Sequence, residues 1–475
     1  MLFSRSGGEV TETAILIEPV QSTPGTGTRE LFGHPRGLTY LFTTEMWERF
    51  SFYGMRSLLV LYMTKHLLLP AHSGAVIGLL PVKRALEGLF GPLPVQPLSS
   101  QIWGFYTALV YFTPIFGGLL ADRVLGRRRT VIIGAVLMAI GHFMMAVEPL
   151  FLFALLFLIV GSGAFKPNIS TQVGGLYAAG DQRRDRAYSI FYVGINIGAF
   201  LAPLVCGTLG EEAGWHYGFA AAGFGMCIGL CIYLYALPLL PTDDAQERAT
   251  TVADPKQPLG RDDWRAIVAL LVLFVPNTLF WACYEQMGNT IILWADADTD
   301  RSVALFGLSA QIPTTSFLAF NPFMIFAFTP FVVALWTRQA VRGREPSTVS
   351  KMALGCVGLT AAYLIMTLAA SSAGGGKASW LWLLCYFVAI TLGELYLSPV
   401  GLSFVTKLAP ARLLSMLMGV WLASSFTGGF LAGWLGSFWS GMAKPEFFLM
   451  IAGIGALAGL TIFGCRWALR GALRQ

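Results

Sequence analysis

The sequence predicts an all-α polytopic membrane protein of the major-facilitator type, with twelve transmembrane helices in two six-helix bundles. Of its 475 residues, 55% are hydrophobic and only 12% are charged, whereas about a quarter of the residues in a soluble protein are charged. Long apolar runs, such as 131–147 and 151–160, favour helices over a β-barrel, because barrel strands need alternating polarity.

Twelve segments reach the roughly 20 residues that a spanning helix needs. The predicted spans are residues 38–64, 100–121, 130–147, 150–176, 187–209, 217–238, 264–294, 316–338, 349–370, 379–407, 413–439 and 446–468. Residues 239–263, rich in Pro, Asp and Thr, divide six spans from six and are interpreted as a linker. The predicted domains are therefore a tail (1–36), an N-terminal bundle (37–238), the linker and a C-terminal bundle (264–475).

Lysine and arginine are unevenly distributed between the segments that join the spans. With the N-terminus inside, 23 of them lie in inside segments, six in outside loops and three within spans. Positive loops stay in the cytoplasm, so we expect both termini there. The polar tail lacks an apolar core after a basic start, so we expect no cleaved signal peptide. This distribution also explains the net charge of +6 without a nucleic-acid partner.

Residues 71–98, between the first two spans, contain the run AVIGLLPVKRALEGLF. This run predicts a short amphipathic helix lying at the outer membrane interface. The alternative is an ordered loop without membrane contact.

Neither the cysteines nor the histidines form a recognisable reactive or metal-binding motif. The seven cysteines lie in or beside apolar segments without a CxxC pair, and the five histidines are scattered. Neither HExxH nor GxSxG occurs. We therefore expect no metal, no cofactor and no enzymatic activity.

The first predicted span carries an unusual set of polar residues in the run EMWERFSFYGMR. At about 100° per residue, Glu45, Glu48, Arg49, Tyr53 and Arg56 fall within an arc of roughly 140°. Ionisable groups in hydrocarbon are costly unless they are paired or hydrated. The stripe therefore faces a watery cavity or partner helices. The alternative is a buried ion-pair cluster that only fixes helix packing.

Three further charged residues, Lys166, Glu285 and Glu394, lie within other predicted spans. Carboxylates that change protonation beside fixed guanidinium groups form a proton-coupling device. Lys166 precedes Pro167, where we expect a kink that presents the ammonium to a cavity. Separate cations and acids suit a zwitterionic ligand. Aromatic side chains that could line its pockets, or simply pack, are Tyr53, Tyr111, Tyr192, Trp281 and Trp421.

Several motifs resemble those of known transporters. The loop GGLLADRVLGRRRT (117–130) resembles the signature loop of the major facilitator superfamily. Four patterns resemble the proton-dependent oligopeptide transporter (POT/PTR) family within it: ExxERF (45–50), GxGxFKPN (161–168), FYVGINIGAF (191–200) and GELxLSPVGLS (393–403). They occur in the family's order, and the resemblance covers nearly the whole chain from residue 36. Residues 239–263 are too short for the two accessory helices that many bacterial members insert there.

This resemblance implies roles for individual residues. It implies proton coupling at Glu45, Glu48 and Arg49. With the aromatic candidates, the predicted substrate-binding residues are Arg49, Tyr53, Arg56, Tyr111, Lys166, Tyr192, Asn196, Trp281, Asn321, Glu394, Ser398 and Trp421. Within this set, the cations would bind a peptide carboxylate, whereas Glu394, Asn321 and Asn196 would bind the amino group.

The resemblance also implies two gates, Arg56 with Glu285 on the outside and Lys166 with Glu394 on the inside. Arg56 and Glu285 lie in the outer halves of spans that both rise outward, so their depths agree. The alternative is that Glu285 pairs within its own half.

The resemblance implies a symporter that imports di- and tripeptides across the cytoplasmic (inner) membrane by alternating access. Protons are the coupling ion, and we expect a functional monomer without cofactors. The same family includes carriers of nitrate and other small anions, which stay an alternative, although an anion gains nothing from a buried Glu394. A membrane sensor without transport activity is the alternative from another class.

Overall fold

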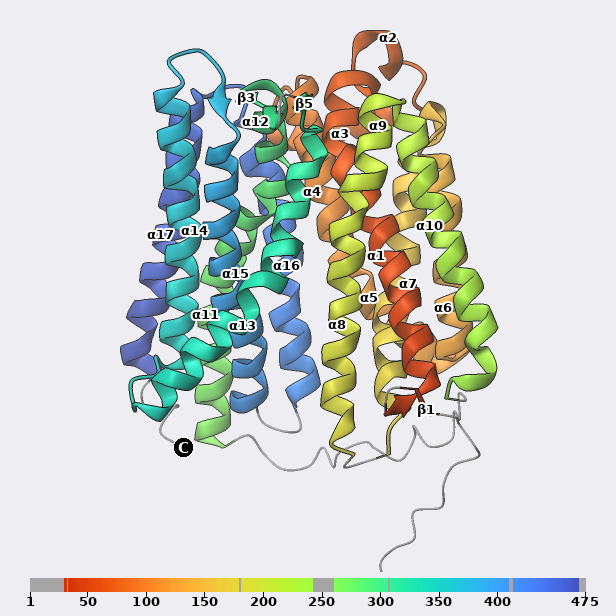
Figure 1. The fold of residues 1–475 in the computed structure, drawn as a ribbon, viewed down its shortest axis with the longest axis vertical. Coiled ribbons are helices and arrows are strands. Elements are labelled where there is room, and N and C mark those ends of the chain that lie inside the picture. Colours follow the sequence, from red (N-terminus) through yellow and green to blue (C-terminus); the bar gives the residue numbers. More distant parts are fainter. Residues whose placement is uncertain are drawn as a thin grey trace, which may run out of the picture.

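The computed structural model describes residues 30–31, 33–178, 181–241, 260–305, 308–409 and 413–469. Long helices stand roughly side by side, the first half of the chain on the right and the second on the left in Figure 1. Most of the predicted tail (1–29) and linker (242–259) lies outside the described residues.

The first half begins with the long helix α1 and continues through helices joined by short turns. Its elements are α1 (Arg36–Tyr62), η1 (Met63–Leu67), α2 (Pro70–Ser73), α3 (Leu79–Phe90), α4 (Val95–Phe112), α5 (Pro114–Leu120), η2 (Ala121–Leu125), α6 (Arg127–Met144), η3 (Glu148–Leu150), α7 (Phe151–Gly175), α8 (Arg183–Ala202), η4 (Pro203–Gly207), α9 (Thr208–Glu212), α10 (Trp215–Ala236) and η5 (Leu237–Leu239). Helix α7 continues through Pro167, so no break occurs at the predicted kink.

The second half is built in the same way. Its helices are α11 (Arg261–Tyr284), η7 (Glu285–Gly288), α12 (Thr290–Ala297), η8 (Thr314–Ala319), α13 (Phe320–Val341), α14 (Thr348–Ser372), α15 (Leu381–Leu408), α16 (Leu414–Gly436) and α17 (Lys444–Leu469). Three pairs of short strands complete the fold: β1 (Glu30–Leu31) with β2 (His34–Pro35), β3 (Thr299–Asp300) with β6 (Ala378–Ser379), and β4 (Ser302–Leu305) with β5 (Leu308–Gln311).

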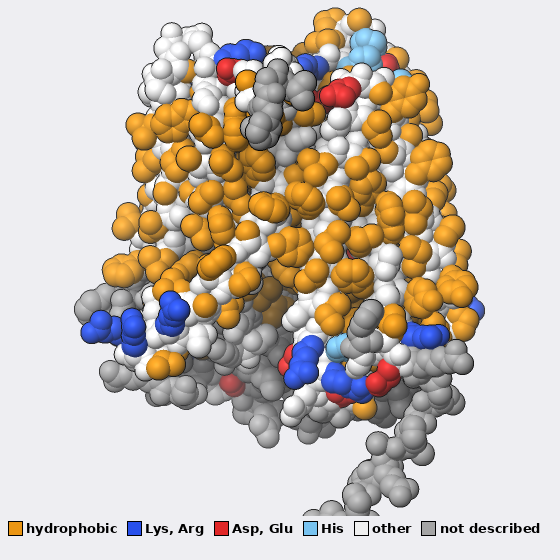
Figure 2. All heavy atoms as spheres, viewed as in Figure 1, with side chains coloured by type: hydrophobic (Ala, Val, Ile, Leu, Met, Phe, Trp, Pro, Cys, Tyr) orange, Lys and Arg blue, Asp and Glu red, His pale blue; other side chains and the backbone are white. Residues whose placement is uncertain are grey.

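The surface is that of a membrane protein. Figure 2 shows hydrophobic side chains over the middle of one face and charged side chains gathered towards its two ends. Ten of the described helical segments are long and apolar enough to cross a membrane. The prediction of an all-helical polytopic membrane protein is therefore confirmed. Helices α1 and α6 are not among the ten; α1 carries charges in its middle, and α6 begins with three arginines.

The two ends of the bundle differ in what they hold. The end at the top of Figure 1, called here the upper end, holds α2, α3, α9 and α12, and the lower end holds β1. Helix α3 lies within the predicted amphipathic segment. It buries Leu79 and Leu86 and exposes Leu80 and Leu89. Its contact with a membrane interface stays a prediction.

Buried apolar side chains form two main clusters. One draws almost entirely on residues 38–240 and the other on residues 267–462. The halves meet where α4 packs on α16 and α8 on α13. At the first contact, a Cβ on Gly104 would lie 2.5 Å from the Cα of Gly433. Only glycine allows the two backbones to approach so closely.

Candidate functional site

A cavity of about 260 Å³ lies between the two halves of the bundle. Its wall comes from α1, α4, α8 and η4 on one side and from α11, η7, η8, α13 and α15 on the other. Predicted residues that line it are Tyr53, Arg56, Tyr111, Tyr192, Asn196, Trp281, Glu285, Asn321, Glu394 and Ser398. The structure therefore brings together side chains from six of the predicted spans.

The acidic side of the cavity is a hydrogen-bonded group around Glu394 on α15. Its carboxylate accepts 2.9 Å hydrogen bonds from the amide of Asn321 and the hydroxyl of Tyr284. Asn321 also donates to Thr391 at 3.1 Å. These donors, both from the second half, fix the orientation of a partly buried carboxylate on the cavity wall.

The cationic group that reaches the cavity from the first half is Arg56 on α1. Its guanidinium forms an ion pair with Glu285 of η7 and lies 5.1 Å from the ring centre of Trp103. Glu285 and Arg56 side chains are only 4% and 13% exposed. The predicted contact between the two halves is therefore present in this structure.

An ion-pair cluster lies about two to three helical turns further towards the lower end of α1. Arg49 Nε lies 3.0 Å from Glu45 Oε1 and 2.5 Å from Glu48 Oε2, and all three side chains are buried. They do not line the cavity. Glu48 Oε1 and Arg49 Nη2 find no hydrogen-bond donor or acceptor among the residues that the structure describes. The cluster is thus buried without being fully satisfied, which is unusual in a purely structural role.

Glycine lets α8 pack closely against this part of α1. A Cβ on Gly198 would lie 2.2 Å from the backbone oxygen of Met46. The ion-pair cluster is therefore held against α8 by direct backbone contact.

Lys166 on α7 lies among aromatic rings and not on the cavity wall. Its Nζ is 4.3 Å from the ring centre of Phe52 and 5.5 Å from that of Tyr111. Among the described residues, no ion pair joins Lys166 to Glu394. An ammonium held over ring faces gains cation–π stabilisation, and Tyr111 connects it to the cavity.

Trp421 on α16 also lies outside the main cavity. It lines a smaller cavity of about 60 Å³, which shares Trp281 and Ser398 with the main one. Gly401 makes room for its ring, because a Cβ there would lie 2.7 Å from Trp421 Cζ2.

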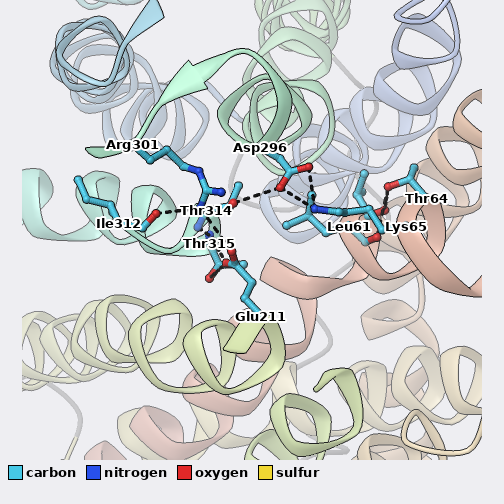
Figure 3. Close-up of polar contacts among 10 residues, drawn as sticks. Leu61, Thr64, Lys65, Glu211, Asp296, Arg301, Ile312, Thr314 and Thr315 are labelled. Carbon is cyan, nitrogen blue, oxygen red and sulfur yellow. Dashed lines mark hydrogen bonds and ion pairs between the residues drawn. The ribbon is translucent and has the colours of Figure 1, made fainter. Parts of the chain in front are cut away.

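A second layer of contacts, drawn in Figure 3, joins the two halves at the upper end. Lys65 of η1 lies 2.8 Å from Asp296 of α12. Glu211 of α9 accepts hydrogen bonds from the backbone amides of Thr314 (2.8 Å) and Thr315 (2.7 Å) at the start of η8. These contacts close the upper end of the cavity, whereas Figure 2 shows the molecule hollowed between its halves further down.

A protein-family comparison identifies the chain. The model described as the POT family matches residues 128–252 and 250–447. The chain belongs to the POT family. This confirms the resemblance seen in its motifs and places it among proton-dependent oligopeptide transporters of the major facilitator superfamily.

Two curated relatives match along nearly their whole length. A "Di-/tripeptide transporter" of Lactococcus lactis subsp. cremoris is 33% identical, over 91% of this chain and 95% of the relative. The "Peptide transporter YePEPT" of Yersinia enterocolitica subsp. palearctica serotype O:3 is 34% identical, over 87% and 90%.

Solved POT structures share the fold. A peptide transporter POT in complex with sulfate superposes with a TM-score of 0.80 at 30% identity, covering 94% of this chain and 98% of that one. A POT family transporter in complex with 5-aminolevulinic acid gives 0.79 at 27% identity, covering 93% and 98%.

Sequence reasoning missed several residues of this POT cavity. Tyr284 lines the wall and holds Glu394, although it directly precedes the predicted Glu285 in the run FWACYEQMGN. The upper contacts of Lys65, Asp296 and Glu211 were missed as well. Nothing in their local sequence signals a partner, because each pairs across more than 100 residues or between halves.

Proposed function

We propose that this POT family member is a proton-coupled symporter that imports di- and tripeptides by alternating access. The observation that carries the proposal is a cavity between the halves with a guanidinium, Arg56, from one half and an oriented carboxylate, Glu394, from the other. Such a wall complements a small zwitterion. A volume of about 260 Å³ suits a ligand smaller than a drug molecule, whose sites are about 300–1,000 Å³. The peptide transporters among its relatives support the same substrate class.

The proposed topology has twelve spans in two six-helix bundles, residues 37–238 and 264–475, with 239–263 as a cytoplasmic linker. Helices α1 and α6 support it, because they pack against α10 and α7 of the same half. The separate apolar cluster in each half supports the two-bundle division. The upper end then faces outside the cytoplasmic membrane, and both termini lie inside. One chain supplies the whole cavity wall, so we propose a functional monomer.

Glu45, Glu48 and Arg49 are proposed to couple proton entry to transport. Protonating either carboxylate removes its attraction to Arg49, and the guanidinium is then free to take another partner. Glu48 Oε1 and Arg49 Nη2 have no hydrogen-bond partner among the described residues. Because these atoms can still accept or donate a hydrogen bond, they support the proposal that the cluster changes its contacts during transport.

The peptide is proposed to lie with its carboxylate towards the cations and its ammonium towards the acidic side. Arg49, Arg56 and Lys166 would receive the carboxylate, and Glu394, Asn321 and Asn196 the amino group. Six further residues would form side-chain pockets: Tyr53, Tyr111, Tyr192, Trp281, Ser398 and Trp421.

Two pairs are proposed to alternate as the halves rock. Arg56 and Glu285, which form an ion pair in this structure, would close the outer side. Lys166 with Glu394 would close the inner side when the outer pair separates. The close contact of α4 with α16 supplies a seam about which rigid halves can move.

The decisive experiment is uptake of labelled dialanine into liposomes that contain the purified chain. An inward proton gradient should drive accumulation, and a protonophore should abolish it. Unlabelled dialanine should compete, whereas nitrate should not. Gradient-driven uptake of labelled nitrate by liposomes that accumulate no dialanine would replace the peptide with a small anion as the substrate. If the proton gradient drove no uptake at all, the remaining candidate function would be a membrane sensor without transport activity.

A further inference from the structure

Two histidines and one carboxylate converge at the upper end of the first half, outside the transport cavity. His66 Nε2 lies 2.6 Å from Glu148 Oε1, and His72 Nδ1 lies 3.1 Å from Glu148 Oε2. Their donor atoms all lie within 4.8 Å of one another. Figure 2 shows histidine side chains at the molecular surface near this end.

The backbone places these three side chains without needing a ligand. His66 lies in η1, directly beyond α1, and His72 lies in the short helix α2 that begins at Pro70. The backbone amide of Ile77 donates to the carbonyl of Pro149 at 3.1 Å, which pins the loop after α2 beside η3 and Glu148. The three donors therefore come from three segments that are already tied together.

The histidine rings have a defined orientation. The rings of His66 and His72 lie 3.9 Å apart, and that of His66 stacks on Tyr62 at 5.7 Å. All three side chains of the cluster are 30–35% exposed. An ion can therefore enter from solvent, while the stacked ring limits the freedom of one ligand.

Two imidazole nitrogens and one carboxylate are a donor set that suits Zn²⁺. Imidazole favours zinc and its neighbours in the first transition series over magnesium or calcium. Three protein ligands with a fourth position left to solvent form a common zinc arrangement. We propose that His66, His72 and Glu148 bind a divalent transition-metal ion, zinc before others, at the upper end of the protein. The ion would replace the hydrogen-bonding protons that now lie between the imidazoles and the carboxylate.

The bound ion would join the end of α1 to the start of α7 within one half of the molecule. Lys65, next to His66 in the chain, forms the ion pair with Asp296 of the other half. The metal site therefore adjoins the upper closure but contains no residue from the other half. Its occupancy should stiffen the first half and leave peptide binding in the cavity intact.

The test is a zinc titration of the full chain in detergent, purified without a polyhistidine tag and treated with chelator. Cys231 and Cys385, the exposed cysteines among the described residues, are replaced by serine in every sample. Binding is measured by competition with a chromophoric chelator and by the rise in unfolding temperature on adding ZnCl₂. Because the assay needs no transport, its result is independent of the proposed function.

The parent should bind one Zn²⁺ per chain and unfold at a higher temperature with it. His66→Ala, His72→Ala and Glu148→Gln should each weaken binding by about 100-fold or more, since loss of even a supporting partner costs roughly 10- to 100-fold. His216→Ala is the matched control, because this exposed histidine lies outside the cluster, and it should bind as the parent does. Absence of zinc binding by the parent, equal binding by all three cluster variants, or an equal loss in His216→Ala would overturn the site.

Discussion

Glu211, near the end of α9, accepts a 2.7 Å hydrogen bond from the backbone amide of Thr315 in the other half of the molecule. Thr315 lies in the first turn of η8, which leads into α13. A carboxylate at a helix N-terminus satisfies free amide groups and interacts favourably with the helix dipole. Here the capping carboxylate and the helix belong to different halves. The cap can therefore form only while the upper end is closed.

Replacing this cap should favour the outward-open state. Glu211→Ala removes charge-assisted hydrogen bonds worth about 1.5–3 kcal/mol. This corresponds to a shift of roughly 10- to 150-fold in the equilibrium between the closed and outward-open states. The distance between spin labels at positions 213 and 309 can be measured by electron–electron double resonance in a variant without the native cysteines. It should be longer in Glu211→Ala than in the parent. Glu212→Ala is the matched control, because Glu212 is exposed beside it. Equal distances in both variants would show that Glu211 does not hold the closure.

The buried cluster on α1 should be required for coupling. We expect Glu45→Gln and Glu48→Gln each to abolish uptake driven by a pH gradient, because neither can then gain or lose a proton beside Arg49. Counterflow of peptide between two equal-pH pools should persist. Glu446→Gln, at an exposed position on α17, should keep both activities. Normal gradient-driven uptake by both cluster variants would contradict the assignment.

Glu394 should recognise the amino end of the peptide. Acetylating that end should weaken binding to the parent by roughly 10- to 150-fold, as expected for a charge-assisted hydrogen bond. In Glu394→Gln the same acetylation should change binding little, whereas amidation of the carboxyl end should weaken parent and variant alike. Competition against labelled dialanine measures the binding of the free, the acetylated and the amidated peptide to each protein. A variant that still discriminates acetylated from free peptide would show that another residue makes this contact.

The Arg56–Glu285 pair should behave as a coupled unit. Arg56→Glu alone leaves two buried acids facing each other, and Glu285→Arg alone leaves two guanidiniums. Breaking such a pair typically costs about 3–5 kcal/mol. Thermal unfolding should therefore occur at clearly lower temperature in each single variant and recover partly in the double variant. Additive losses in the double variant would mean that the two charges do not stabilise each other.

The contact between α4 and α16 should tolerate no side chain. Gly104→Ala would place a methyl group 2.5 Å from Gly433 Cα, so the helices must separate, and we expect lower unfolding temperature and slower exchange of peptide. Gly453→Ala on α17 is the control, because its Cβ would meet no atom within 4 Å. Equal rates in the two variants would show that the contact is not part of the moving seam.

The overall architecture was predictable because long apolar runs can only be helices in a bilayer. The Arg56–Glu285 contact was also predictable, since the predicted depths of the two residues along their spans agree. Lys166 and Trp421 show the limit of that reasoning. Motif position indicated the cavity for both, but in the structure Lys166 lies over the ring of Phe52 and Trp421 lines a neighbouring cavity.

The upper closure and the histidine cluster could not be predicted from sequence for a different reason. Lys65, Glu211 and Glu148 lie in or beside loops, where apolar periodicity gives no register. Their partners are set by how the loops fold over the ends of the helices, such as the backbone contact of Ile77 with Pro149. Glu148 lies 76 residues after His72 in the chain. No short sequence motif therefore connects the two residues.

The charges on α1 have a consequence for how the protein is made. A charged side chain at the centre of a helix costs about 2.5–3.5 kcal/mol when that helix enters the bilayer from the translocon, and α1 carries Glu45, Glu48, Arg49 and Arg56. Its ion pairs offset part of this cost, and its packing partners α8 and α10 emerge from the ribosome more than 100 residues later. Stable insertion of the first helix should therefore await synthesis of α8 and α10.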